Sequence, residues 1–166
     1  MPRLYLMRHA DAGAAPEGGM DSDRRLTAEG GEAAARMGTW LAERLDAEAR
    51  ALDHVVFSGV ARTQDTLNRL TPALEPMPEA RADRRIYDAT TGGLLAVLAG
   101  VPEGTQTALL IGHNPGLEGL LAGLTDQPLR AYPTAGIAEL ELDSDWGALG
   151  PGSAQLTAFA APHLLG

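Results

Sequence analysis

LYLMRHAD at Leu4–Asp11 and LLIGHNPG at Leu109–Gly116 are the two stretches that decide the fold class of this chain. Each is an apolar run typical of a buried strand, and each leads into a histidine, as Arg8-His9 and as His113. Ligand sites of open α/β sheets lie where strands end and loops begin. We therefore expect both histidines at one edge of a sheet, where they would suit phosphoryl transfer through a covalent phosphohistidine.

Strand-like and helix-like segments alternate along the rest of the chain. A helix with its apolar face at Ala34, Met37, Leu41 and Leu45 is predicted to follow Thr27 as N-cap, and a second helix is predicted over residues 61–70, ending before Pro72. Asn114-Pro115 predicts another helix start, with Leu117, Leu120, Leu121 and Leu124 as its apolar face. The other predicted segments are strands at 4–7, 53–58, 107–111, 136–142 and 153–160, helical turns at 93–98, and an irregular stretch at 76–85 with a short edge strand.

This alternation predicts an α/β fold, a three-layer αβα sandwich with a mostly parallel central sheet. The turn-rich residues 143–152 indicate a hairpin between the last two strands. The sequence has no internal repeat and no linker. Its 166 residues are enough to bury a core, so we expect a single domain over residues 1–166.

The composition excludes several classes of protein. With no cysteine, the chain forms no disulfide and no thiolate metal site. Its net charge of −9 argues against nucleic acid as a partner, and no apolar run is long enough to span a membrane. Residues 1–10 do not resemble a signal peptide, so we expect a cytoplasmic protein. The sequence leaves the oligomeric state open.

Four side chains are candidates for a phosphoryl site. A neutral His9 is a competent nucleophile toward phosphorus once its other ring nitrogen is held by an acceptor. Arg8 could clamp phosphoryl oxygens, and Arg62 lies on the first turn of a helix whose N-terminus favours an anion. His113 could donate a hydrogen bond to a phosphoryl oxygen. Each has an ordinary structural alternative, as a strand-end cap, a solvated arginine or a core histidine.

Other polar residues near these four have structural interpretations. Asn114 is expected to cap the helix that follows it, and its amide could also face the phosphate. Ser58 and Thr63 are expected to cap or to hydrogen-bond within loops rather than to catalyse. His9, Asp11 and His113 could instead bind zinc or iron, but Arg8 beside them would repel a cation. We therefore expect no metal and no cofactor.

Three motifs together resemble the histidine phosphatase (phosphoglycerate mutase-like) superfamily. They are Arg8-His9-Ala10, Ser58…Arg62-Thr63…Thr66 and Gly112–Gly116. The short length and the words RHA, DRRLT, IYDA and GHNPG resemble its small SixA-type phosphohistidine phosphatase branch. Further similarity at Tyr132-Pro133-Thr134, Trp146, Pro151-Gly152-Ser153 and Pro162 extends the resemblance over nearly the whole chain.

The resemblance implies a role for each matching residue. His9 would be the nucleophile that becomes phosphorylated. Arg8, Arg62 and His113 would surround the phosphoryl group and stabilise its charge in the transition state. Arg24 would line the mouth of the pocket, and no metal is implied.

The general acid is where this sequence departs from the family. Larger members carry a glutamate after the third strand, but here the stretch reads Arg84-Arg85-Ile86-Tyr87-Asp88. Asp88 comes two or three residues late and could serve only if its loop curls back. Asp11 is the second candidate, and loop hydrogen bonding is the alternative for both.

The missing acid favours a substrate with a good leaving group. The P–N bond of phosphohistidine is labile, whereas an alkyl phosphate needs a proton donor. The chain also has little sequence to build a lid, so an open pocket for a phosphorylated protein side chain is expected. Two alternatives remain: a phosphatase of small phosphate esters, and a non-catalytic module that binds phosphoproteins.

Overall fold

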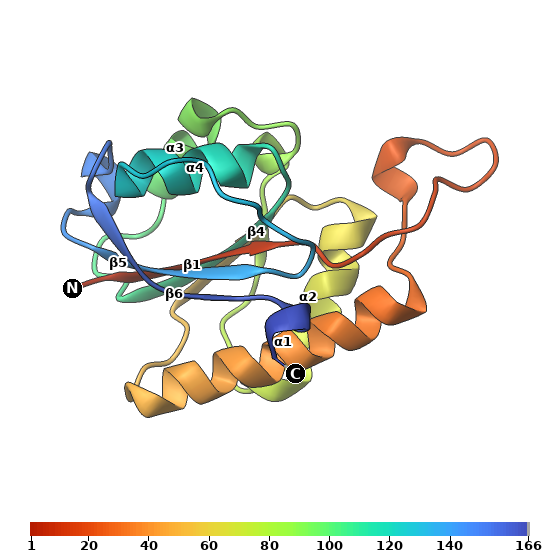
Figure 1. Cartoon of the computed structure of the whole chain (residues 1–166), viewed down its shortest axis with the longest axis horizontal. Coiled ribbons are helices and arrows are strands. Elements are labelled where there is room, and N and C mark those ends of the chain that lie inside the picture. The colour runs from red at the N-terminus through yellow and green to blue at the C-terminus, as the bar shows by residue number, and fades with distance from the viewer. Residues whose placement is uncertain (166) are drawn as a thin grey trace.

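The computed structural model describes residues 1–165 and has a six-stranded sheet at its centre (Figure 1). In the order β3-β2-β4-β1-β5-β6, the strands are β3 (Arg81–Ala82), β2 (His54–Phe57), β4 (Thr107–Gly112), β1 (Arg3–Arg8), β5 (Ile137–Leu142) and β6 (Ala154–Ala160). The pairs among the first four strands are parallel, and β5 runs antiparallel to both β1 and β6. The mostly parallel sheet with a final hairpin is confirmed.

Helices cover both faces of the sheet (Figure 1). On one face lie α1 (Ala28–Ala47) and α2 (Ala61–Leu74), and on the other lie α3 (Thr91–Ala99) and α4 (Gly116–Thr125). Four single 3-10 turns complete the chain: η1 (Asp21–Asp23), η2 (Arg84–Ile86), η3 (Trp146–Ala148) and η4 (Pro162–Leu164). The predicted three-layer α/β sandwich is therefore confirmed.

The central strands supply both hydrophobic layers. In β1, Tyr5 and Met7 pack in the cluster under α1 and α2, whereas Leu4 and Leu6 pack in the cluster under α3 and α4. A parallel strand that is buried on both faces reads as a continuous apolar run. This is why the run before His9 has no polar alternation.

The predicted helix faces are confirmed, but one predicted helix end is wrong. The Thr27 side chain accepts a hydrogen bond from the Gly30 amide, and the predicted apolar residues of α1 and α4 are all buried. In contrast, α2 does not end before Pro72 but continues to Leu74. A proline in a helix removes one backbone hydrogen bond. The packing of Leu74, which is 7% exposed, against the core offsets that loss.

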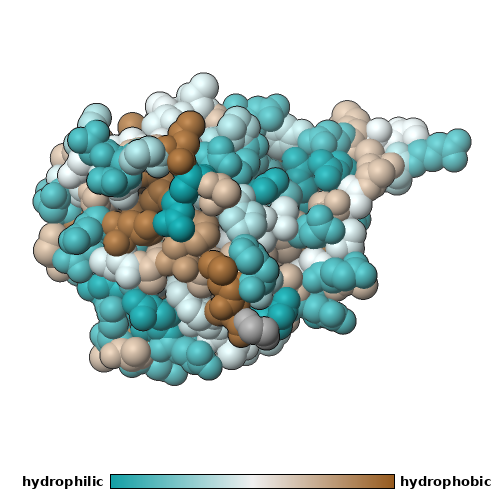
Figure 2. Space-filling model, in the orientation of Figure 1, coloured by the Kyte–Doolittle hydropathy of each residue, from teal (hydrophilic) through white to brown (hydrophobic). Residues whose placement is uncertain are grey.

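An arm formed by residues 12–26 projects from one end of the sheet (Figure 1). A single β-bridge between Ala12 and Leu26 closes its base. Figure 2 shows a hydrophilic tip on this arm, and apolar residues that form separate patches on the visible face of the body. No helix within residues 1–165 combines the length and the apolar character needed to cross a membrane.

We expect Gly30→Ala to destabilise the protein by about 1–3 kcal/mol. In an open helix this change would stabilise by about 1 kcal/mol. Here the added Cβ would lie 2.1 Å from the carbonyl oxygen of Asp11, so the first turn of α1 and the loop after His9 would have to move apart. Denaturant-induced unfolding measures the change in the free energy of unfolding.

Gly123→Ala in α4 is the matched control for this prediction. Its added Cβ meets only the Thr91 methyl group, at 3.8 Å, so we expect an unchanged or slightly higher stability. A Gly30→Ala protein as stable as the wild type would contradict the close packing of α1 on this loop.

Candidate active site

The register between β1 and β4 places the two site histidines side by side. Arg8 is paired with Gly112, so His9 and His113 leave their strands at the same level of the sheet. The His9 amide donates to the Gly112 carbonyl at 3.1 Å, and the two imidazole rings have centroids 5.2 Å apart. In the neighbouring pair, Phe57 lies opposite Ile111, which brings Ser58 to the same edge.

This edge of the sheet holds a cavity of about 230 Å³. Its lining includes every residue that the sequence singled out for the site: Arg8, His9, Asp11, Arg24, Arg62, Asp88, His113 and Asn114. It also includes Ala12, Tyr87 and Thr134. A larger hollow of about 930 Å³ beside β3, around His54 and Arg81, shares no residue with this cavity.

His9 is buried, and its ring is held by the backbone. Its Nδ1 lies 2.8 Å from the carbonyl oxygen of Ala10. Because a carbonyl only accepts, Nδ1 carries the proton and Nε2 is left with a free lone pair. Burial and, to a lesser extent, the positive charges of Arg62 and Arg8 together lower the pKa of His9 to about 4. The ring is therefore neutral at neutral pH.

The loop after His9 is tied to the start of α2 through Thr66. The Ala10 amide donates to the Thr66 hydroxyl at 3.0 Å, and this hydroxyl donates to the Arg62 carbonyl at 2.7 Å. Thr66 is completely buried. This pair of hydrogen bonds fixes the position of His9 relative to Arg62.

Two buried or half-buried arginines bring positive charge to the cavity. Arg62, the second residue of α2, is 6% exposed. Arg8 donates from Nη1 to the Tyr132 carbonyl at 2.9 Å. Within residues 1–165, the Nε atoms of both arginines are buried and have no hydrogen-bond partner. Each guanidinium thus keeps donor capacity that a bound anion would satisfy.

His113 is held from behind by Ser58. Its Nε2 lies 2.7 Å from the Ser58 hydroxyl, while its Nδ1 is buried without a partner among the described residues. Burial lowers the pKa of His113 to about 3, and the neighbouring His9 and Arg62 act in the same direction. His113 therefore lines the cavity with a neutral ring, one nitrogen of which has no partner among the described residues.

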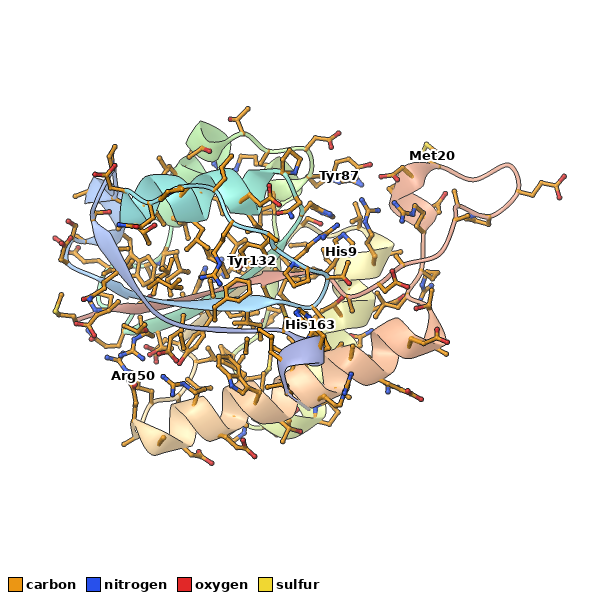
Figure 3. All side chains as sticks on the ribbon, in the orientation of Figure 1. His9, Met20, Arg50, Tyr87, Tyr132 and His163 are labelled. Atoms are coloured by element: carbon orange, nitrogen blue, oxygen red, sulfur yellow. The ribbon has the colours of Figure 1, made fainter. Side chains whose placement is uncertain are left out.

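The arm contacts two of the cavity-lining residues, Arg62 and Tyr87, through Asp21. Its backbone carbonyl and its carboxylate accept from Arg62 at 3.0 and 3.1 Å, and its carboxylate also accepts from the Tyr87 hydroxyl. The bond from Tyr87 is the main cause that lowers the pKa of Asp21 to about 2, with Arg24 and Arg62 adding to it. Figure 3 shows His9 at the end of β1, below Tyr87 and beside the segment that carries Met20.

Asp21 and Tyr87 were not predicted as site residues. Tyr87 belongs to the IYDA word that resembles the SixA branch, so the sequence held a signal for it. Nothing in the residues around Asp21 marks it, because its place depends on how the arm folds back.

Arg24 and the two candidate acids line the cavity from exposed or half-exposed loops. Arg24 donates to the Gly13 carbonyl at 2.7 Å and to the Asp21 carboxylate at 3.3 Å. Asp11 accepts from the Thr27 hydroxyl at 3.0 Å. Asp88 lies in the left-handed region, with a φ of 53°, and it lines the cavity. Its loop thus curls back toward His9, which was the condition for Asp88 to be a candidate acid.

The prediction that Asn114 caps the following helix is wrong. α4 begins at Gly116 with Pro115 at the N-cap position, and no side chain caps it. The Asn114 amide nitrogen instead donates to Glu118 at 3.0 Å and to the Tyr132 carbonyl at 3.1 Å. These two acceptors turn the side chain away from the backbone amides of α4.

The described residues were also compared with the requirements of a metal site. Among them, no group of three or more His, Cys, Asp or Glu side chains is arranged to hold a metal ion.

Comparisons with known proteins point to one family. No family model matches the chain. An uncharacterised protein of Mycobacterium tuberculosis strain H37Rv is 32% identical over 167 residues, which cover 95% of this chain and all of that protein. A protein of Nakamurella multipartitia assigned as the phosphohistidine phosphatase SixA has a TM-score of 0.82 at 30% identity, over 97% of this chain and 96% of that one. The protein histidine phosphatase SixA in complex with tungstate has the same fold, with a TM-score of 0.83 at 24% identity over 99% of each chain.

The sheet, the paired histidines and these similarities agree. The chain belongs to the histidine phosphatase superfamily and, within it, to the SixA-type branch. It is therefore an enzyme of the histidine phosphatase class, and its substrate is phosphorylated.

We expect His9 and His113 to remain neutral at pH 5.5, where a solvent-exposed histidine is mostly protonated. Their pKa values in the folded protein, about 4 and about 3, lie below the ordinary value of 6.5. The unfolded chain therefore binds more protons, and the free energy of unfolding should fall as the pH drops from about 6.5 toward 4. NMR titration of the two ring Cε1–H signals, assigned with His9→Gln and His113→Gln, measures the protonation. Titration of either ring near pH 6.5 would contradict the buried, cation-flanked site.

Proposed function

We propose that this protein removes the phosphoryl group from phosphohistidine on another protein, through a phosphorylated His9. The main support is the geometry of His9. Its Nδ1 is held by the Ala10 carbonyl, its Nε2 lone pair is free, and it lies in a cavity with Arg8 and Arg62. A neutral imidazole with a fixed tautomer is the nucleophile that this chemistry requires.

In the first step, Nε2 of His9 forms a bond to phosphorus while the bond from phosphorus to the substrate imidazole breaks. The substrate ring leaves as neutral imidazole when its other nitrogen already carries a proton. The Nδ1–H of His9 stays on the Ala10 carbonyl while its ring becomes a phosphoimidazolium. In the second step, water attacks phosphorus, releasing inorganic phosphate and neutral His9, and the proton of the water goes to the phosphate.

The residues around His9 stabilise the charge of the transferred group. Arg8 and Arg62 offer positive charge and unpaired Nε donors, and the N-terminus of α2 adds a favourable dipole. We propose that His113 and Arg24 contact the same group, and that the Asn114 side chain contributes at the rim. In a phosphoryl transfer, such fixed charges supply most of the catalysis.

The choice of phosphohistidine rests on the leaving group. Asp11 and Asp88 reach the cavity, but Asp11 is engaged by Thr27. An imidazole leaving group needs neither of them, whereas an alkoxide would need an acid. The exposed rim at these two residues also leaves the cavity open to a side chain of another protein.

We expect an acid-labile, base-stable phosphoenzyme when the protein is mixed with a radiolabelled phosphohistidine protein in the presence of chelator. His9→Ala should abolish both the labelled enzyme and turnover, because the attacking nitrogen is gone. Acid and base treatment of rapidly quenched samples identifies the bond. His163→Ala, whose exposed ring lies in η4 outside the cavity, is the control and should behave as the wild type.

Three outcomes would overturn the proposal. A phosphoenzyme in His9→Ala would place the nucleophile elsewhere. Faster turnover of a sugar or glycerate phosphate than of the phosphohistidine protein would favour the small-ester phosphatase. Binding of the phosphoprotein without release of phosphate would favour a non-catalytic module.

We expect Asp88→Asn and Asp11→Asn each to change turnover of phosphohistidine by less than about threefold. If either carboxyl donates a proton, its loss should instead slow any residual hydrolysis of an alkyl phosphate by about 10²-fold or more. Steady-state rates with both substrates, measured side by side, test this. A large loss with phosphohistidine in either variant would show that the leaving group needs protonation by that residue.

A further inference from the structure

A row of buried polar atoms continues from the His113 ring through two hydroxyls. Nε2 of His113 is 2.7 Å from the Ser58 hydroxyl, which is 3.0 Å from the Thr63 hydroxyl. Thr63 in turn donates to the Val60 carbonyl at 2.9 Å. Ser58 and Thr63 are both 0% exposed, so within this row they exchange no hydrogen bonds with solvent. Neither hydroxyl lines the catalytic cavity.

The hydrogens in this row fit together in one direction. Each hydroxyl has a single hydrogen to donate. If Thr63 donates to Val60, it can only accept from Ser58, and Ser58 can then only accept from His113. Nε2 of His113 must in that case carry the proton, and Nδ1 is bare.

The opposite direction is less favourable. If Thr63 donated to Ser58 and Ser58 to Nε2, the single proton of the neutral ring would sit on Nδ1. That atom is buried and has no hydrogen-bond partner within the described residues. A buried N–H without an acceptor is rarer and more costly than an unfilled lone pair. The described contacts therefore favour the first direction.

We propose that Ser58 and Thr63 are positioning residues that hold His113 as its Nε2–H tautomer, so that Nδ1 is the atom that exchanges a proton or hydrogen bond with the phosphoryl group. The catalytic part of this inference rests on the function proposed above, whereas the tautomer does not. The bond from Thr63 to the Val60 carbonyl fits the sequence-based interpretation of the two hydroxyls as caps or loop hydrogen-bonding groups, and the proposal adds a positioning role to it.

This arrangement lets His113 change charge without rearrangement. When a phosphoryl group brings a proton to Nδ1, the bond from Nε2 to Ser58 is already that of an imidazolium. The ring then donates to the phosphoryl oxygen from Nδ1 while the two hydroxyls stay as they were. Preorganised donors of this kind cost no reorientation at the moment of reaction.

NMR of protein labelled with ¹⁵N-histidine tests the tautomer directly, without substrate. In the wild type, long-range ¹H–¹⁵N correlations of His113, assigned with His113→Gln, should show a protonated Nε2 and a bare Nδ1. Ser58→Ala should abolish this pattern and give a mixture of tautomers. Thr63→Val, which removes only the hydroxyl from a side chain of similar shape, should weaken it, and Thr63→Ser should restore it.

The kinetic expectation follows from the same contacts. Ser58→Ala should lower kcat by about 10- to 100-fold, the range found when a metal-bound histidine loses the outer partner that orients its ring. KM should change little, since Arg8 and Arg62 still hold the phosphoryl group. Thr71→Val is the matched control, because the Thr71 hydroxyl donates to a carbonyl of the same helix outside this row. It should change neither the His113 signals nor kcat.

The outcomes separate this inference from the proposed function. A protonated Nδ1 in the wild type, or an Nε2–H tautomer that persists in both Ser58→Ala and Thr63→Val, would overturn the inference whatever the enzyme hydrolyses. An unchanged kcat in Ser58→Ala would overturn its catalytic part. An Nε2–H tautomer that depends on Ser58, in a protein that hydrolyses no phosphohistidine, would leave the tautomer supported and count against the proposed function alone.

Discussion

The parallel pairing of β1 with β4 is the constraint on which the rest of the site depends. It aligns Arg8 with Gly112 and thereby sets His9 beside His113. A shift of this pairing by one residue would turn every side chain of β1 to the other face of the sheet. Both hydrophobic layers draw on β1, so such a shift would exchange Leu4 and Leu6 with Tyr5 and Met7 between the two layers and disrupt the packing of each. The packing of both hydrophobic layers therefore fixes the position of the two imidazoles relative to each other.

The site combines buried charge with unpaired donors, an arrangement that is unfavourable without a ligand. Arg62 is buried and finds its partners on the arm, at the carbonyl and carboxylate of Asp21. These contacts compensate part of the charge in the free enzyme and leave Nε without a partner in the described residues. The two histidines avoid the same problem by staying neutral. The cavity therefore keeps its capacity to bind an anion and adds no further positive charge at rest.

Sequence patterns predicted what local periodicity and strand ends determine. The strand before His9, the helix after Thr27 and the position of Arg62 could be read from the spacing of apolar residues and caps. The predicted helix end at Pro72 was wrong because the packing of Leu74 outweighs one lost hydrogen bond. The predicted cap at Asn114 was wrong because its amide donates to Glu118 and to the Tyr132 carbonyl of a distant loop. Asp21 meets Arg62 only because the arm folds back. The row from Ser58 to Thr63 depends on distances between side chains, which no spacing in the sequence specifies.

The net charge of −9 and the arginine-lined cavity act over different ranges. The overall field repels an anion at long range, whereas the charges of Arg8 and Arg62 act at short range inside the cavity. Salt screens interactions beyond about 8–10 Å and leaves buried contacts largely intact. Moderate ionic strength therefore weakens the long-range repulsion that slows association, and it leaves the short-range attraction inside the cavity largely unchanged. For the proposed function, this combination favours a substrate whose negative charge is concentrated in one protruding group rather than spread over a surface.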